Sequence, residues 1–377
     1  DCWVRLGMVY RKMGEYELAV HTAEEGLKVA NTHGLLDWKA ELLSGLGFHQ
    51  RAQGLYEAAV KSHEQAMNIF QNQCGMRREE AVQFSYIGSL YIDMGYLDES
   101  QKAFKQAKDI AHTIGLRREY SWIIANEGIL HCRLGNYDKA YDLQQESIKI
   151  VKENNHLDSQ VIRYTDLAMT FFIMGKYQES ENAILIALQN AAQDEKFILP
   201  SKLPEAYLES PDLEDKLPHE MQSPGDHPRR GIILARIYLH RNELLKAYQV
   251  IESVQRRQHK MNPHRHLTTL LNAIIVHRLN RLNEAESTYL EAISCSDDIQ
   301  KRTNNCYQAQ YTKALALAGL SYLSKGQAQK SLLKQTKETF RKARQMCNTI
   351  GVIDDVKSLI HTLSIIDESG DLEFFKD

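Results

Sequence analysis

The feature that most restricts the fold of this chain is a glycine that returns at an almost constant interval. The segments "MGEYELA", "QGLYEAA", "MGYLDES", "LGNYDKA" and "MGKYQES" each place a glycine second, and successive glycines are 40, 41, 40 and 40 residues apart. These glycines are Gly14, Gly54, Gly95, Gly135 and Gly175. A period of this length, kept over five copies, is typical of a tandem array in which each copy is one supersecondary unit.

Each copy also carries small residues at fixed distances from its turn glycine. One lies five positions after the glycine and another lies seven positions before it. The ten residues are Ala19, Ala59, Ser100, Ala140, Ser180, Gly7, Gly47, Gly88, Gly128 and Ala168. Apolar residues between these positions recur at spacings of three and four, which predicts two amphipathic helices per unit. The turn glycine can end the first helix in the left-handed conformation, and the small residues let two antiparallel helices approach closely.

A second series of glycines marks the end of each unit. "THGLLD", "QCGMRRE" and "TIGLRRE" place Gly34, Gly75 and Gly115 where the second helix of a unit should end, and "NNHLDS" holds the same place without a glycine. After residue 230 the pattern continues with Asn242, Asn280 and Gly326 at the turns. Asparagine is the usual substitute for glycine in the left-handed conformation, so the array is expected to resume.

The interval from Gly175 to Asn242 is 27 residues longer than one period. We therefore predict units one to five over residues 1–195, a proline-rich insertion over 196–230, and degenerate units six to eight with a terminal capping helix over 231–377. The expected fold is all-α: a right-handed superhelix of about eight helical hairpins whose first helices line a concave groove. Leucines at intervals of four or five residues predict that the insertion lies against units five and six, and a tolerated surface loop is the alternative.

Turn glycines with small pairs at these positions resemble tetratricopeptide repeats with extended second helices. Residues 311–356, with "YTKALALAGLSYL" and "ETFRKARQMCNTIGVIDDV", are similar to the C-terminal arms of signal-transduction ATPases with numerous domains (the STAND class). Kinesin light chains and spindle adaptors of the Pins type also have repeats near this length. The resemblance to the STAND class implies a sensor arm that binds an inducer, with an ATPase domain N-terminal to it. Because the first residues already have a helical pattern, the chain is expected to be a fragment of a longer protein.

Composition argues against several other classes of protein. The chain has 46 Lys and Arg against 49 Asp and Glu, and this balance disfavours a broad nucleic-acid-binding face. No apolar run is long enough to span a membrane, and six scattered cysteines without a CxxC pair predict a cytoplasmic protein. Phosphate-loop, HExxH and GxSxG motifs are missing from the sequence, so we predict a non-enzymatic module without a cofactor or metal. An enzyme or a nucleic-acid-binding solenoid is the disfavoured third hypothesis, after the sensor arm and a free-standing adaptor that binds partner peptides.

Two clusters of side chains have both a functional and a structural interpretation. "HKMNPHRHL" gathers His259, His264 and His266, which could form a metal site, although a solvated turn between helices is the favoured interpretation. The doublets Arg77–Arg78 and Arg117–Arg118 lie 40 residues apart and could hold an acidic peptide or a phosphate. The favoured interpretation is that these arginines pair with the neighbouring acids Glu79, Glu80 and Glu119.

The candidate ligand-binding residues follow from the geometry of the repeat. Side chains of the first helices that precede the turn should face the groove, where aromatic residues can anchor an extended peptide or a protein loop. In units two to four these residues are Phe48, Arg51, Ser89, Asp93, Trp122, Ile129 and Arg133. For Phe48 and Trp122, packing against the next hairpin is an equal alternative.

Overall fold

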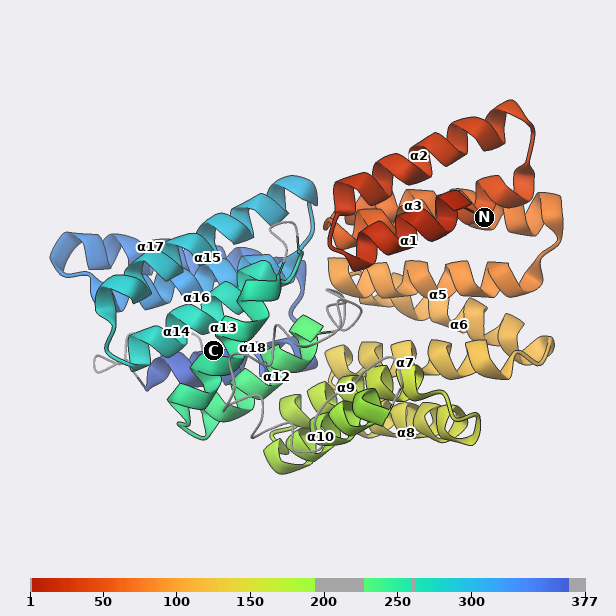
Figure 1. The fold of residues 1–377 in the computed structure, drawn as a ribbon. Coiled ribbons are helices and arrows are strands. Elements are labelled where there is room, and N and C mark those ends of the chain that lie inside the picture. The colour runs from red at the N-terminus through yellow and green to blue at the C-terminus, as the bar shows by residue number, and fades with distance from the viewer. Residues whose placement is uncertain (1, 194–226, 259–261, 366–377) are drawn as a thin grey trace.

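The computed structural model describes residues 2–193, 227–258 and 262–365, which form α-helices, one short π-helical segment and no strand. Successive helices pair as antiparallel hairpins in a tandem array (Figure 1). The hairpins of units one to five are α1 (Cys2–Lys12) with α2 (Tyr16–Thr32), α3 (Leu36–Ala52) with α4 (Tyr56–Ile69), α5 (Arg77–Met94) with α6 (Leu97–Thr113), α7 (Arg117–Leu134) with α8 (Tyr137–Glu153), and α9 (Leu157–Ile173) with α10 (Tyr177–Gln193). Units six to eight are α12 (His227–His240) with α13 (Leu244–Arg257), α14 (Arg265–Arg278) with α15 (Leu282–Arg302), and α16 (Tyr307–Leu323) with α17 (Gly326–Met346). The π-helical segment η1 (Phe70–Cys74) extends α4, and α18 (Ile350–Ser364) follows the last hairpin. The predicted all-α solenoid of eight hairpins and a terminal helix is confirmed.

The turns of the hairpins have the backbone conformation that the repeat predicts. The five turn glycines have φ values of 75° to 86°. Asn242 and Asn280 both have φ 61°, so asparagine replaces glycine at these turns as predicted. Asn155 has φ 52° and fills the place of the missing glycine in the fourth unit. The degenerate units therefore keep the turn geometry after losing the glycine.

The small residues lie where the two helices of a hairpin come closest. In unit three, the Ser100 hydroxyl donates a hydrogen bond to the carbonyl oxygen of Gly88 at 2.8 Å. In unit five, the Ser180 hydroxyl donates to the carbonyl oxygen of Ala168 at 2.7 Å. A Cβ atom on Gly88 would lie 2.8 Å from the ring of Phe104. A larger residue at either small position would therefore separate the two helices.

The array curves until its C-terminal half contacts its N-terminal half (Figure 1). Tyr56 and Val60 of α4 and Met94 of α5 share a buried cluster with Ile299 of α15 and Ala309 of α16. The backbone N–H of Asn304 donates to the Glu57 carboxylate at 2.9 Å, and the Arg302 guanidinium donates to the carbonyl oxygen of Gln53 at 3.3 Å. The turn ends of the early first helices are consequently covered by units seven and eight.

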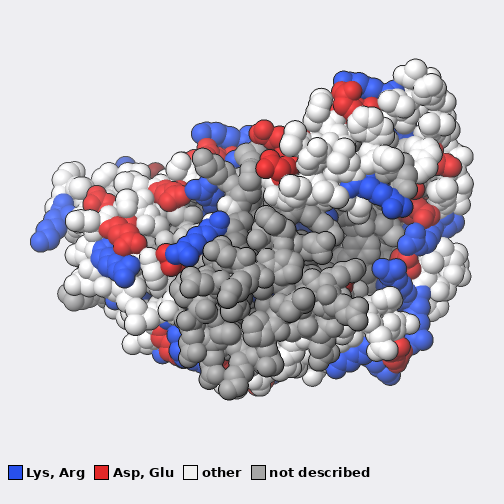
Figure 2. Space-filling view, viewed as in Figure 1, with Lys and Arg blue, Asp and Glu red and all other residues white. Residues whose placement is uncertain are grey.

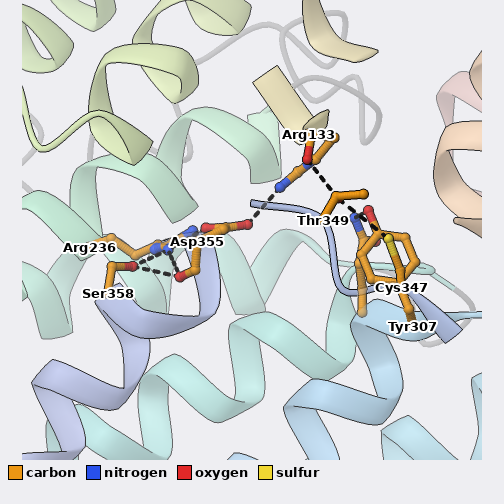
Figure 3. Close-up of polar contacts among 8 residues, drawn as sticks. Arg133, Arg236, Tyr307, Cys347, Thr349, Asp355 and Ser358 are labelled. Carbon is orange, nitrogen blue, oxygen red and sulfur yellow. Dashed lines mark hydrogen bonds and ion pairs between the residues drawn. The ribbon is translucent and has the colours of Figure 1, made fainter. Parts of the chain in front are cut away.

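Helix α18 completes this closure. It packs against α7, α9 and α16, so the predicted terminal helix caps the contact between the two halves. Asp355 of α18 accepts hydrogen bonds from Arg133 of α7 at 2.7 Å and from Arg236 of α12 at 2.6 Å. Figure 3 shows the two guanidinium groups reaching Asp355 from different sides. We call these three residues the latch, because they tie α7, α12 and α18 together.

The latch is held by charge in a largely dehydrated place. Arg236 is 3% exposed at its side chain, and its guanidinium also donates to the Ser358 hydroxyl at 2.6 Å. Burial alone would raise the pKa of Asp355, yet Arg236 and Arg133 hold that pKa below its usual value. The carboxylate is therefore charged at neutral pH.

The proline-rich insertion lies almost entirely outside the described residues, so its predicted position against the array stays a prediction. Helix α12 begins at His227, and residues 227–230 of the range predicted as insertion are therefore helical. Arg229 of this helix lies 2.9 Å from the buried carboxylate of Asp166 in α9 and ties unit six to unit five. Among the helices that the structure describes, none has the length and apolar character needed to cross a membrane.

Candidate functional site

A groove of about 710 Å³ runs across the stacked first helices of the N-terminal half. Side chains of α1, α3, α5, α7 and α9 line it, with a contribution from the C-terminal end of α8. This agrees with the prediction that first helices line the groove. The residues that matter below are Arg11, Phe48, His49, Tyr86, Arg118 and Trp122.

Three aromatic rings from successive units form a ladder along this groove. The ring centroids of Phe48 and Tyr86 are 4.2 Å apart, and those of Tyr86 and Trp122 are 4.6 Å apart. Both pairs have the edge-to-face geometry that aromatic rings favour. The Arg11 guanidinium lies 6.0 Å from the centroid of the Phe48 ring, at the outer limit of a cation–π contact. All three rings are half-buried, so each offers part of its surface to the groove.

Two buried histidines lie beside the ladder. The His63 ring is 5.4 Å from the Phe48 ring, and its Nδ1 atom is 2.8 Å from the side-chain oxygen of Gln83. Burial lowers the pKa of His63 to about 4. Burial, with a smaller contribution from Arg11, also lowers the pKa of His49 to about 4. Both rings are neutral at physiological pH, and the wall beside the ladder is therefore uncharged.

The charges of the groove lie on its rim. Arg78 is 2.9 Å from Glu79 and 2.7 Å from Glu119, and the second of these pairs links units three and four. Arg77 is 2.6 Å from Glu80. These contacts confirm the predicted pairing of the arginine doublets with neighbouring acids. Figure 2 shows Lys and Arg side chains interspersed with Asp and Glu over the described part of one face of the molecule.

Of the predicted ligand-binding residues, Phe48 and Trp122 line the groove. Both interpretations of these rings hold, because each packs against Tyr86 of the neighbouring unit and also faces the groove. The structure places the other predicted side chains at contacts within the protein.

Those other residues lie near the turns, where the two halves meet. The guanidinium of Arg51 is 2.7 Å from the carboxylate of Asp93. Ser89 is buried, and its hydroxyl donates to the carbonyl oxygen of Ser85 at 3.0 Å. Ile129 packs against the main hydrophobic core, and Arg133 belongs to the latch. Closure of the array therefore engages the turn end of each first helix and leaves the opposite end facing the groove.

Tyr86 is the functional candidate that sequence reasoning missed. It lies nine residues before Gly95, whereas Ser89 and Asp93 lie six and two residues before it. Spacings of three and four place all three side chains on one face of α5. That face was predicted correctly, and extending it by one helical turn toward the N-terminus would have reached Tyr86.

The histidine cluster differs from its predicted structure. His266 is buried, and its Nδ1 atom lies 2.9 Å from the hydroxyl of Thr312 in α16. Burial lowers the pKa of His264 to about 4. The interpretation as a solvated turn was wrong, because this turn packs beneath α16 and against the N-terminal half, where Pro263 approaches Gly54. His259 lies outside the described residues, and within those described no group of side chains has the arrangement of a metal site.

Comparisons with known proteins agree with the repeat assignment. Residues 2–72 match a family model described as tetratricopeptide repeat, and residues 83–176 match one described as anaphase-promoting complex subunit 5. Superkiller complex protein 3 of Mus musculus is 23% identical over 210 residues, which cover 52% of this chain and 12% of that protein. The Homo sapiens protein of the same name is 24% identical over 204 residues, again covering 52% of this chain and 12% of that protein. The chain therefore spans about an eighth of the length of these relatives.

A solved structure shares the fold over most of the chain. The crystal structure of a Rap protein complexed with Competence and Sporulation Factor superimposes with a TM-score of 0.59 at 15% sequence identity, covering 80% of this chain and 75% of that one. Together with the family models, this likeness identifies the array as tetratricopeptide repeats.

Proposed function

We propose that this chain is a non-enzymatic recognition module that binds an extended segment of a partner protein along the aromatic ladder. The observation that carries the proposal is the ladder itself, since Phe48, Tyr86 and Trp122 come from three successive units and line one groove. Aromatic side chains that are half-buried in a preformed hollow are the commonest anchors of binding energy at protein interfaces. Tetratricopeptide arrays offer such extended concave surfaces.

The groove indicates the chemistry of the segment. Neutral histidines beside the ladder favour apolar or aromatic side chains there. The exposed guanidinium of Arg118 on the rim favours an acidic residue next to them. The related Rap structure holds Competence and Sporulation Factor, which supports a binding role for a closed array of this kind.

Two biological settings are compatible with this activity. In the first, which we favour, the module is the sensor arm of a STAND regulator and the bound segment or a small inducer controls an ATPase domain. In the second, it is a free-standing adaptor that collects partner peptides. A nucleotide-binding domain in the same polypeptide would support the first setting, and a partner complex without one would support the second.

The test is affinity capture from cell extract with wild type and with the double variant Phe48→Ala/Trp122→Ala. Truncating an aromatic anchor typically weakens binding by about 2 kcal/mol or more, or roughly thirtyfold, so the double variant should lose its partners. Tyr141→Ala is the matched control, because Tyr141 is an exposed aromatic residue on α8 that packs beside Phe171 outside the groove. Equal capture by wild type and the double variant, with both proteins folded by circular dichroism, would remove the groove as the binding site.

A further inference from the structure

The first hairpin exposes an apolar stripe on the side of α1 that faces away from the groove. The exposed fractions are 40% for Trp3, 41% for Leu6, 49% for Val9 and 66% for Met13. Spacings of three and four place these residues on one face of the helix and the turn after it. Val4, Met8 and Arg11, which line the groove, lie on the opposite face. We call Trp3, Leu6, Val9 and Met13 the α1 stripe.

Positions equivalent to the α1 stripe are covered in the later units. Counted back from the turn glycine, the stripe occupies positions eleven, eight, five and one. Unit three has Phe84, Ile87, Leu90 and Met94 at these positions. Ile87, Leu90 and Met94 are buried, as are Leu43 and Leu46 in unit two, Ile124 and Leu130 in unit four, and Tyr164 and Leu167 in unit five.

The helix that covers these positions is the second helix of the preceding unit. Leu90 and Met94 of α5 share a buried cluster with Tyr56, Ala59 and Val60 of α4. Unit one and unit three are also the most alike in sequence at the four positions, with an aromatic residue, two aliphatic residues and a methionine. The α1 stripe therefore has the chemistry of a surface that receives a helix like α4.

The opposite end of the array has a different surface. The exposed residues of α17 include Lys330, Lys334, Lys337, Glu338 and Arg341, and no large apolar residue of this helix is exposed. Terminal units of a repeat array need such a polar outer face to remain soluble. Since the first hairpin has a contiguous apolar stripe in the same situation, it differs from a solvent-facing end and matches an interface.

We infer that the α1 stripe is a docking site for an amphipathic helix that packs on α1 as α4 packs on α5. The partner helix presents an aromatic residue followed three and four positions later by a small and a β-branched residue, as Tyr56, Ala59 and Val60 do. Such a helix fills the space between Leu6 and Val9 and removes both side chains from water. This site is separate from the aromatic ladder and serves a different kind of ligand.

The experiment uses a fluorescent, helix-stabilised peptide of residues 56–69 and the full chain, with binding followed by fluorescence anisotropy. Saturable binding is expected, and Leu6→Gln/Val9→Gln should weaken it about tenfold or more because two buried apolar contacts are lost. Leu290→Gln is the matched control, since Leu290 of α15 is 54% exposed and far from α1 in the sequence. A peptide carrying Val60→Asp should not bind.

Three outcomes would overturn the inference. The peptide does not bind, or it binds Leu6→Gln/Val9→Gln as well as wild type, or sedimentation shows a wild-type dimer that this double variant converts to a monomer. The last outcome would assign the stripe to self-association instead. Because Phe48→Ala/Trp122→Ala should leave peptide binding unchanged, failure of this site and failure of the groove are distinguishable.

Discussion

Replacing Asp355 by asparagine tests whether the latch holds the two halves of the array together. The substitution keeps the size of the side chain and removes its charge. Two guanidinium groups, with side chains 13% exposed at Arg133 and 3% exposed at Arg236, then lose their common carboxylate. Removing one partner of a buried ion pair typically costs about 3–5 kcal/mol, because the remaining charge is left uncompensated.

The magnitude can be refined from the contacts. Asp355 accepts one hydrogen bond from each arginine through separate oxygens, and asparagine keeps a single carbonyl oxygen. One charge-assisted hydrogen bond, worth about 1.5–3 kcal/mol, is therefore lost outright. Since the carboxylate side chain is 20% exposed, water will offset part of the remaining charge effect. We expect Asp355→Asn to lower the free energy of unfolding by about 3 kcal/mol, near the low end of the range for buried pairs.

The assay is urea unfolding followed by circular dichroism, with hydrogen exchange to locate the change. Exchange should increase in α18 and α12 and stay unchanged in α6. Asp298→Asn is the matched control, because Asp298 pairs with Lys301 on the surface with side chains 51% and 76% exposed, and its loss should cost less than about 0.5 kcal/mol. Adding Arg236→Met to Asp355→Asn should recover part of the loss by removing an unpaired charge. If Asp355→Asn and Asp298→Asn have the same stability, the latch does not hold the array closed.

Three further predictions concern the same fold. Because the pKa of Asp355 is lowered in the folded protein, its contribution is present above the unfolded pKa of about 3.9 and is lost as pH falls through the folded pKa; the stability difference between wild type and Asp355→Asn should be constant near pH 7 and shrink below about pH 4 in urea titrations. Gly351→Ala would place a Cβ atom 1.8 Å from the carbonyl oxygen of Cys132, so it should cost about 3 kcal/mol or more and loosen α18, whereas Gly34→Ala, with φ 63° and open space around it, should cost only about 1 kcal/mol by thermal unfolding. Ser100→Ala removes one hydrogen bond at a position where three other units have alanine, and a loss above about 1.5 kcal/mol in urea unfolding would contradict the interpretation of this position as a site of close helix approach.

The candidate site was only partly predictable from the sequence. Phe48 and Trp122 were identified because the repeat fixes which face of each first helix points into the groove. Tyr86 was missed, although it lies on the predicted face of α5, because the search stopped one helical turn too early. Arg51, Asp93 and Arg133 occupy equally suitable positions in the repeat, and no local pattern shows that the C-terminal half covers them.

The sequence alone determined the hairpins of this protein. Left-handed turns, close helix approach and helical periodicity act over distances of a few residues to one unit, so each unit records them independently. Asn155 and Asn280 fulfil the turn geometry even where the glycine is gone. Such features are readable because they are repeated and short in range.

Only the tertiary structure decided which face of the array stays open. Arg133 and Asp355 are 222 residues apart, and their contact depends on the small rotation of each unit relative to the last, summed over several units. A sum of small rotations is set by packing details that no single unit displays. The latch, the covered turn ends and the aromatic ladder left facing the groove are all consequences of that accumulated curvature.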